Sequence, residues 1–187
     1  MNKVIGGRIM KVVENGIKVD FHIHSVASKH KEEAGKVDDS TIENIGVLIR
    51  MLNDRQINMC AISDHDNFDI NIYRKLKLQE NKGTIQKVLP AVEFSVRYDS
   101  KVIHIITIFD DCDEEKLSNI QKIIFDLKNN KPLYDEEKAF SEEKFLDIIK
   151  QIDLNVVMIA HQKESLSSKN TRNNDVMSLG KGFFRLF

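Results

Sequence analysis

The sequence has few cysteines, no long apolar run and no excess of charge of either sign. Its two cysteines, Cys60 and Cys112, form no CxxC pair and no disulfide framework, which is typical of a protein of the reducing cytoplasm. Because no run of ~18 apolar residues is present, we expect no transmembrane helix, and residues 1–7 do not resemble a signal peptide. The 28 basic and 29 acidic residues argue against nucleic-acid binding through overall charge.

The sequence also lacks a GxxxxGK[ST] phosphate-binding loop, an internal repeat and a low-complexity segment. Any ATPase module would therefore lie outside this chain. A length of 187 residues suits one domain with a sizeable core, so we expect a single domain over residues 1–187.

Hydrophobic periodicity predicts alternating strands and helices. A strand that ends near Ile23 precedes a helix in which Ser40 and Glu43 form a capping box, and a second strand follows over 57–63. Strand–helix–strand order is typical of a parallel α/β fold. A helix is predicted over 70–80, and strands over 88–95 and 101–109 are joined as an antiparallel hairpin. A helix follows the acidic run 110–115 and presents Leu117, Ile120, Ile124 and Leu127 on one face. The last predicted elements are a helix capped by Ser141 and a strand over 156–160.

Three of the six histidines lie between residues 22 and 30. His22 and His24 are two residues apart in the first predicted strand, so both imidazoles lie on the same face of that strand. Two neighbouring imidazoles at a strand end can serve as metal ligands. The alternative is a strand with two histidines that bind nothing, and the HxH spacing alone does not decide between the two interpretations.

The remaining residues favour the metal interpretation. His65, His104 and His161 each lie in, or directly after, a predicted strand, and Glu93 lies in an otherwise apolar one. A buried carboxylate is unfavourable unless it is paired or bound to a metal. The pattern therefore predicts a metal site.

The chain resembles the polymerase and histidinol phosphatase (PHP) domain family at five places. These are DFHIHS at 20–25 with Ser28 and His30 after it, SDH at 63–65, AVEFS at 91–95, His104, and AH at 160–161. They follow the family's order and extend from about Lys18 to His161, which is most of the chain. The resemblance implies an α/β fold, a distorted (β/α)7 barrel of the TIM-like type, with metals at the C-terminal ends of its strands.

The resemblance also implies a ligand set. His22, His24 and Glu93 would hold one metal; Glu93, His104 and His161 would hold a second, with Glu93 as the bridge; and His30 and His65 would hold a third. We therefore expect two or three divalent metals, and nitrogen and oxygen ligands of this kind suit zinc, manganese or iron.

One part of the family pattern is missing. Its last motif, an Asp-x-His near the final strand, normally adds a ligand to the first metal and one to the third, and no histidine follows His161. Complete α/β barrels also usually need more than ~200 residues. We therefore expect a PHP barrel that is incomplete at its C-terminus. The apolar stretch 183–187 and an unpaired strand edge then predict that copies of the chain associate.

The expected reaction is hydrolysis of a phosphomonoester or phosphodiester. Two close metals lower the pKa of a bridging water and supply hydroxide near neutral pH, so no serine or cysteine nucleophile is needed. Glu93, Asp64 and His65 are the candidate catalytic residues. Asp64 either orients an imidazole, which we favour, or binds metal weakly.

Three interpretations of the function stay open. The chain is a phosphoesterase that acts on a small phosphorylated metabolite or nucleotide, a nuclease or PHP module of a larger DNA-processing protein, or a metal-binding module without turnover. Relatives in the family are attached to polymerase and ATPase modules, which here would lie outside the chain. A complete gene sequence and assays with both ester types would separate these interpretations.

Two polar segments have open roles. The loop 31–36 is either a solvated linker or a flap over the metals. After the last expected ligand, Lys163, Lys169 and Arg172 are candidates for binding a substrate phosphate, and the alternative for them is a polar surface loop.

Overall fold

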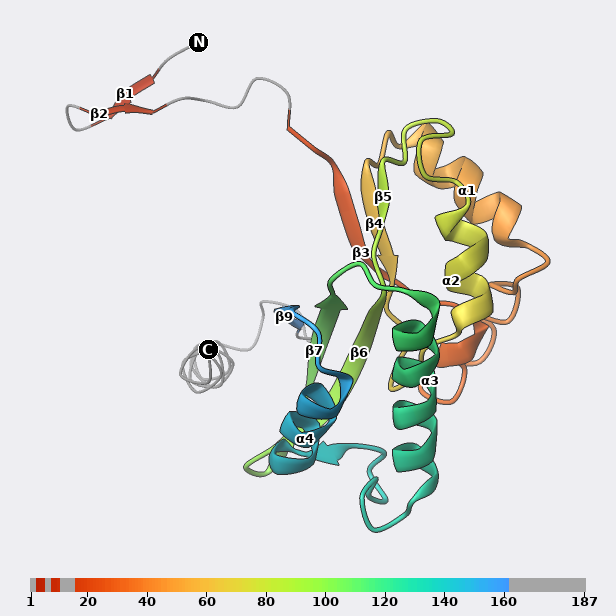
Figure 1. Cartoon of the computed structure of the whole chain (residues 1–187), viewed down its shortest axis with the longest axis vertical. Coiled ribbons are helices and arrows are strands. Elements are labelled where there is room, and N and C mark those ends of the chain that lie inside the picture. The colour runs from red at the N-terminus through yellow and green to blue at the C-terminus, as the bar shows by residue number, and fades with distance from the viewer. Residues whose placement is uncertain (1–2, 6–7, 11–15, 162–187) are drawn as a thin grey trace.

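The computed structural model of the chain describes residues 3–5, 8–10 and 16–161 (Figure 1). This part is a mixed α/β structure with a parallel sheet in the order β3-β4-β5 and a mixed sheet in the order β8-β6-β7-β9. A short antiparallel pair, β1 (Lys3–Ile5) and β2 (Arg8–Met10), precedes them. No helix in the described ranges is long and apolar enough to cross a membrane.

The parallel sheet is built from two strand–helix–strand units. Its elements in chain order are β3 (Val19–Ile23), α1 (Ile45–Asp54), β4 (Met59–Ile62), α2 (Ile70–Lys77) and β5 (Lys87–Val88). Parallel strands need a crossover connection, and α1 and α2 provide the two crossovers. The predicted parallel α/β arrangement of this first part is confirmed.

The mixed sheet is organised around a long hairpin. Strands β6 (Ala91–Tyr98) and β7 (Lys101–Phe109) are antiparallel, as predicted, and Asp99 occupies the turn with a φ of 55°. Strand β9 (Val156–His161) pairs antiparallel to β7, and the two-residue strand β8 (Phe140–Ser141) pairs parallel to β6. The hairpin thus brings its strands to the centre of the sheet, where most of their residues are buried.

Two capped helices cover this sheet. Helix α3 (Glu114–Asn129) begins after Asp113, whose carboxylate accepts from the amide of Lys116, and α4 (Glu142–Ile152) begins after Ser141, whose hydroxyl accepts from the amide of Lys144. The predicted cap at Ser141 is confirmed. The predicted apolar faces are also confirmed, because their residues are buried or pack against the core: Leu117, Ile120, Ile124, Leu127, Phe145, Ile148, Ile149 and Ile152.

Two local predictions are wrong. Helix α1 does not begin at a Ser40–Glu43 capping box; it begins after Asn44, because the Ser40 carbonyl accepts from the amide of Val26 (3.0 Å) and the chain turns again before the helix. The predicted strand 88–95 is two strands, β5 and β6. Pro90, which has no N–H to give to a ladder, separates them, and they pair with different neighbours.

The described residues form no closed barrel. The two sheets meet at a single bridge, in which His65 and Glu93 are parallel partners. Strand β5 has only two residues and ends before Pro90, so few backbone groups are available there to join the two sheets by hydrogen bonds. The sheets of the described residues are thus less continuous than the expected barrel, and incompleteness at the C-terminus stays a prediction, because residues 162–187 lie outside the described part.

The outer strands of this arrangement expose apolar side chains. Val19 on β3 is 50% exposed, and Val157 and Ile159 on β9 are 62% and 40% exposed. Both strands are at the ends of their sheets in the described part of the chain. Exposed apolar edges favour association, and association of copies of this chain stays a prediction.

Candidate metal centre

Glu93 lies at the centre of a cluster of imidazoles. Its side chain is fully buried. Its Oε2 atom is 3.0 Å from His22 Nε2 and 3.1 Å from His24 Nε2, and its Oε1 atom is 2.6 Å from His104 Nδ1 and 3.6 Å from His65 Nδ1. Both carboxylate oxygens are therefore surrounded by nitrogen atoms that can bind metal.

The sheets explain why these residues meet. His22 and His24 lie at the end of β3 on one face, as the alternation of a strand requires. His104 on β7 is paired with Ser95, so it is the diagonal neighbour of Glu93 across the hairpin. His65 follows β4 and pairs directly with Glu93. The centre thus forms where the parallel and mixed sheets touch.

The imidazoles determine the charge of Glu93. Burial by itself raises the pKa of this carboxyl, but hydrogen bonds from His104, His22 and His24 lower it far below its ordinary value. The hydrogen bond to Glu93 in turn raises the pKa of His22. Glu93 is therefore a buried carboxylate that carries its negative charge, which is the form that binds cations.

A second carboxylate, Glu32, completes a neighbouring group. Its Oε1 atom is 3.0 Å from His65 Nε2 and 3.4 Å from His24 Nδ1. Glu32 lies in the polar loop 31–36, and its sequence position alone did not predict a ligand. A carboxylate eight residues after the second histidine of an HxH pair, in a loop beside it, was the available signal. The fold turns this loop back over the two histidines.

His30 is placed differently from the expectation. It belongs to none of the three groups of potential ligands that the described residues form, although its Nε2 atom is buried without a hydrogen-bond partner. Burial, together with Lys128 and Lys31, lowers the pKa of His30 to about 4, so the imidazole is neutral at pH 7. Its carbonyl oxygen accepts from Lys138 Nζ at 3.0 Å.

Among the described residues, the Asp64 carboxylate contacts serines and not an imidazole. Its Oδ1 accepts from the Ser25 amide (2.6 Å) and the Ser28 hydroxyl (2.8 Å), and its Oδ2 accepts from the Ser25 hydroxyl (2.6 Å). Burial raises the pKa of Asp64, and these hydrogen bonds oppose that shift. Ser28 in turn contacts His24, so any orienting effect of Asp64 on an imidazole passes through this hydroxyl.

Asp66 and Lys31 form a buried ion pair that was not predicted from the sequence. Lys31 Nζ is 2.6 Å from Asp66 Oδ2 and also donates to Ser95 Oγ and to the Lys138 carbonyl. Asp66 Oδ1 accepts from the Ser95 amide at 2.7 Å, and Tyr134 donates to Oδ2 at 3.0 Å. This network joins the loop 31–36 to the residues next to Glu93.

Several expected site residues lie partly or wholly outside the described part of the chain. The backbone of His161 pairs with His104 in the β7–β9 ladder, but its side chain is not described, and its role as a ligand stays a prediction. Lys163, Lys169, Arg172 and the apolar stretch 183–187 lie outside the described residues.

The donor set fits divalent metal ions. The described residues form three groups of potential ligands, and within each group the ligand atoms lie within 4.8 Å of one another. The groups are His22, His24 and Glu93; His65, Glu93 and His104; and His24, Glu32 and His65. Imidazole nitrogens with carboxylate oxygens are the ligands preferred by zinc, manganese and iron. Glu93 belongs to two groups, as the expected bridging role requires.

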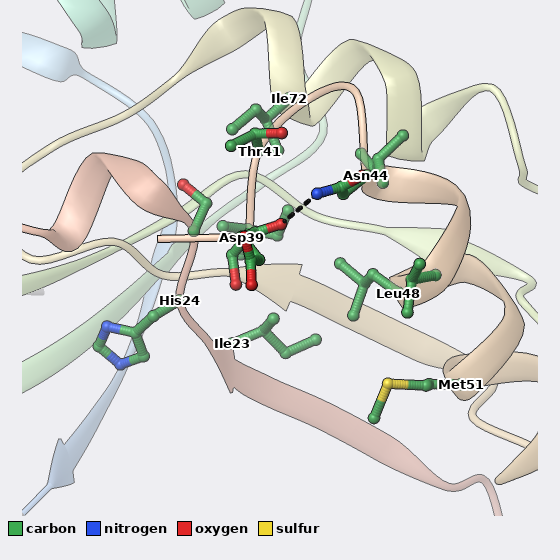
Figure 2. Close-up of a pocket in the computed structure, with 13 residues that line it drawn as sticks. Ile23, His24, Asp39, Thr41, Asn44, Leu48, Met51 and Ile72 are labelled. Carbon is green, nitrogen blue, oxygen red and sulfur yellow. Dashed lines mark hydrogen bonds between the residues drawn. The ribbon is translucent and has the colours of Figure 1, made fainter. Parts of the chain in front are cut away.

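An apolar pocket of about 480 Å³ lies on the other side of β3 (Figure 2). Its lining includes Ile23, Leu48 and Met51, and Asn44 Nδ2 at its rim donates to the Asp39 carbonyl at 3.0 Å. Ile23 points toward the helix α1 side chains, whereas the His24 ring points away from them. The pocket therefore lies between β3 and α1, and His24 borders both this pocket and the candidate metal centre.

Comparisons with known proteins find distant structural similarity. No protein-family profile and no curated protein sequence matches the chain. Among solved structures, it is similar to an amidohydrolase from Chromobacterium violaceum that contains sulfate and no metal, with 21% identity, 60% of this chain and 34% of that chain covered, and a TM-score of 0.38. It is also similar to a protein of Bifidobacterium adolescentis to which metal-dependent phosphoesterase activity is assigned provisionally, with 13% identity, 90% and 64% covered, and a TM-score of 0.40. The chain thus spans about a third of the length of the first protein and under two thirds of the length of the second.

Proposed function

We propose that the chain is a metal-dependent phosphoesterase of the PHP type. One observation carries the proposal. The fully buried Glu93 is surrounded by His22 and His24 from the end of β3, by His65 after β4 and by His104 on β7, and these residues occur in the order of the PHP motifs. A carboxylate buried among imidazoles has no simpler explanation than shared binding of cations.

The ligand groups indicate which residues hold each metal. His22, His24 and Glu93 would hold one, and Glu93, His104 and His65 a second, with His161 as the further ligand that the family pattern implies. Divalent metals bound here would supply Lewis acidity and lower the pKa of bound water. Glu93 would offer one negative charge to both cations, and its buried position would keep water from competing for it.

The substrate belongs to the same proposal. It would be a phosphorylated metabolite, a nucleotide or a nucleic acid, and monoester and diester substrates separate these classes. Nitrophenyl phosphate and bis-nitrophenyl phosphate are suitable probes, assayed with manganese or zinc supplied. Turnover of the diester alone would favour the nuclease, and turnover of the monoester alone would favour the metabolite phosphatase.

The first experiment is elemental analysis of protein purified without chelator. We expect bound transition metal in the wild type and its loss in Glu93→Gln. The matched control is Glu33→Gln, because Glu33 is exposed and pairs with Lys36 at the surface. If the wild type holds no metal and takes none up from added zinc or manganese, the proposed function is wrong. Bound metal without turnover of either ester would favour a metal-binding module.

A further inference from the structure

His24 presents its two ring nitrogens to two different groups of ligands. Its Nε2 atom is 3.1 Å from Glu93 Oε2. Its Nδ1 atom is 3.1 Å from Ser28 Oγ and 3.4 Å from Glu32 Oε1. A neutral imidazole has one nitrogen that donates a proton and one that can bind a metal. The tautomer of His24 therefore decides which group it can serve.

Apart from its contact with His24, the Ser28 hydroxyl makes two hydrogen bonds. Its side chain is fully buried, and its proton goes to Asp64 Oδ1 at 2.8 Å. Its oxygen accepts from the backbone amide of His65 at 2.9 Å, and a backbone N–H can only donate. A hydroxyl oxygen has two acceptor sites, so the one that remains faces His24 Nδ1 and requires an N–H there.

Asp64 keeps the Ser28 proton in this direction. Its carboxylate receives the amide and hydroxyl of Ser25 as well as the hydroxyl of Ser28, and Ser25 Oγ itself accepts from the Ala27 amide at 3.2 Å. With these donors around it, the Asp64 carboxylate acts only as an acceptor, so the Ser28 hydroxyl donates to it. Glu32 acts in the same sense, because a carboxylate beside Nδ1 also accepts a proton from it.

We propose that Ser28, oriented by Asp64, holds His24 as the Nδ1–H tautomer, so that Nε2 binds metal together with His22 and Glu93. Ser28 is then a positioning residue for the metal centre, and the inference rests on the proposed function. It has a second consequence. With a proton on Nδ1, His24 cannot bind a metal held by Glu32 and His65. Only Glu32 and His65 then remain as ligands in that group.

The direct test is the tautomer of His24 in the zinc-loaded full-length chain, in which zinc replaces the proton that Nε2 shares with the Glu93 carboxylate 3.1 Å away. Nitrogen-15 spectra of histidine-labelled protein at about pH 8, above the ordinary histidine pKa, distinguish the two tautomers. The signals of His24 are identified by their loss in His24→Gln. We expect a protonated Nδ1 and an unprotonated Nε2. A protonated Nε2 in the wild type would overturn the inference, and this measurement needs no variant of Ser28.

Metal affinity gives the second readout, measured by competition with a chelator for zinc. Ser28→Ala removes the acceptor of His24 Nδ1, and loss of such a supporting contact lowers metal affinity about 10- to 100-fold. The matched control is Ser63→Ala, because Ser63 is also fully buried and its hydroxyl has no hydrogen-bond partner in the described residues. Equal zinc affinity in the two variants would overturn the inference.

The two readouts also separate this inference from the proposed function. If the wild type binds zinc through His24 Nε2 but hydrolyses neither ester, the phosphoesterase proposal fails and the assignment of the tautomer stands. If the wild type binds zinc and its His24 is protonated on Nε2, the metal centre stands and the role of Ser28 is wrong.

Discussion

The amide of Asp66 donates a hydrogen bond to the carbonyl oxygen of Glu93 at 2.9 Å, and the amide of Glu93 donates to the carbonyl of Asp64 at 3.1 Å. These two bonds are the place where the parallel sheet joins the mixed sheet. Asp66 adopts a φ of 45°, which non-glycine residues rarely do. The backbone pairing with Glu93 therefore depends on the hydrogen bonds and the ion pair that hold the Asp66 side chain. The position of Glu93 is therefore tied to the buried network around Asp66.

Breaking this network should destabilise the fold. Lys31→Met leaves the fully buried Asp66 carboxylate without its cation, and the expected loss is about 3–5 kcal/mol in the free energy of unfolding. Urea denaturation measures it. The control is Lys122→Met, because the Lys122–Asp126 pair is mostly exposed and is worth about 0–1 kcal/mol. A double variant, Lys31→Met with Asp66→Asn, should recover part of the loss; equal effects at Lys31 and Lys122 would contradict the prediction.

Glu93→Gln should abolish activity more completely than His30→Ala. Glu93 belongs to two groups of ligands, and an amide offers no charge to either cation. His30 belongs to none of them in the described residues. Rates of ester hydrolysis with manganese in excess are the measurement. Similar residual rates in the two variants would count against Glu93 as the bridge.

Glu32→Gln should weaken a more loosely bound metal and spare the tighter ones. Glu32 contacts His65 Nε2 at 3.0 Å, away from the side of the ring that faces Glu93. We expect the weakest step of zinc binding to lose at least about tenfold in affinity. Equilibrium dialysis follows it, with Glu33→Gln as the exposed neighbour control. An unchanged binding curve for Glu32→Gln would remove Glu32 from the metal centre.

The helix caps give a test of the fold that does not involve metal. Ser141→Ala removes the hydroxyl that accepts from the Lys144 amide, which costs about 1 kcal/mol of stability. Ser40→Ala should change stability by less than about 0.5 kcal/mol, because Ser40 is exposed and α1 begins after Asn44. Thermal and urea unfolding of the two variants compare these sites. A larger loss at Ser40 would restore the capping box.

The sequence by itself determined the local features of this protein. The period of two in β3 puts His22 and His24 on one face, the short connection after Tyr98 makes a hairpin, and Ser141 begins α4. These features depend on neighbours in the chain, so residue order is enough to predict them. The same local logic failed at Ser40, where a bond from Val26 competes with the helix start.

Only the tertiary structure decided which distant groups meet. Glu32 reaches His65, Lys31 reaches Asp66, and the hydroxyl of Ser28 lies between Asp64 and His24. All of these contacts involve the loop after β3, whose path has no periodicity to reveal it. That path is determined by buried charges and hydrogen bonds that are satisfied only when the two sheets have come together, because an unpaired polar group in the interior is unfavourable.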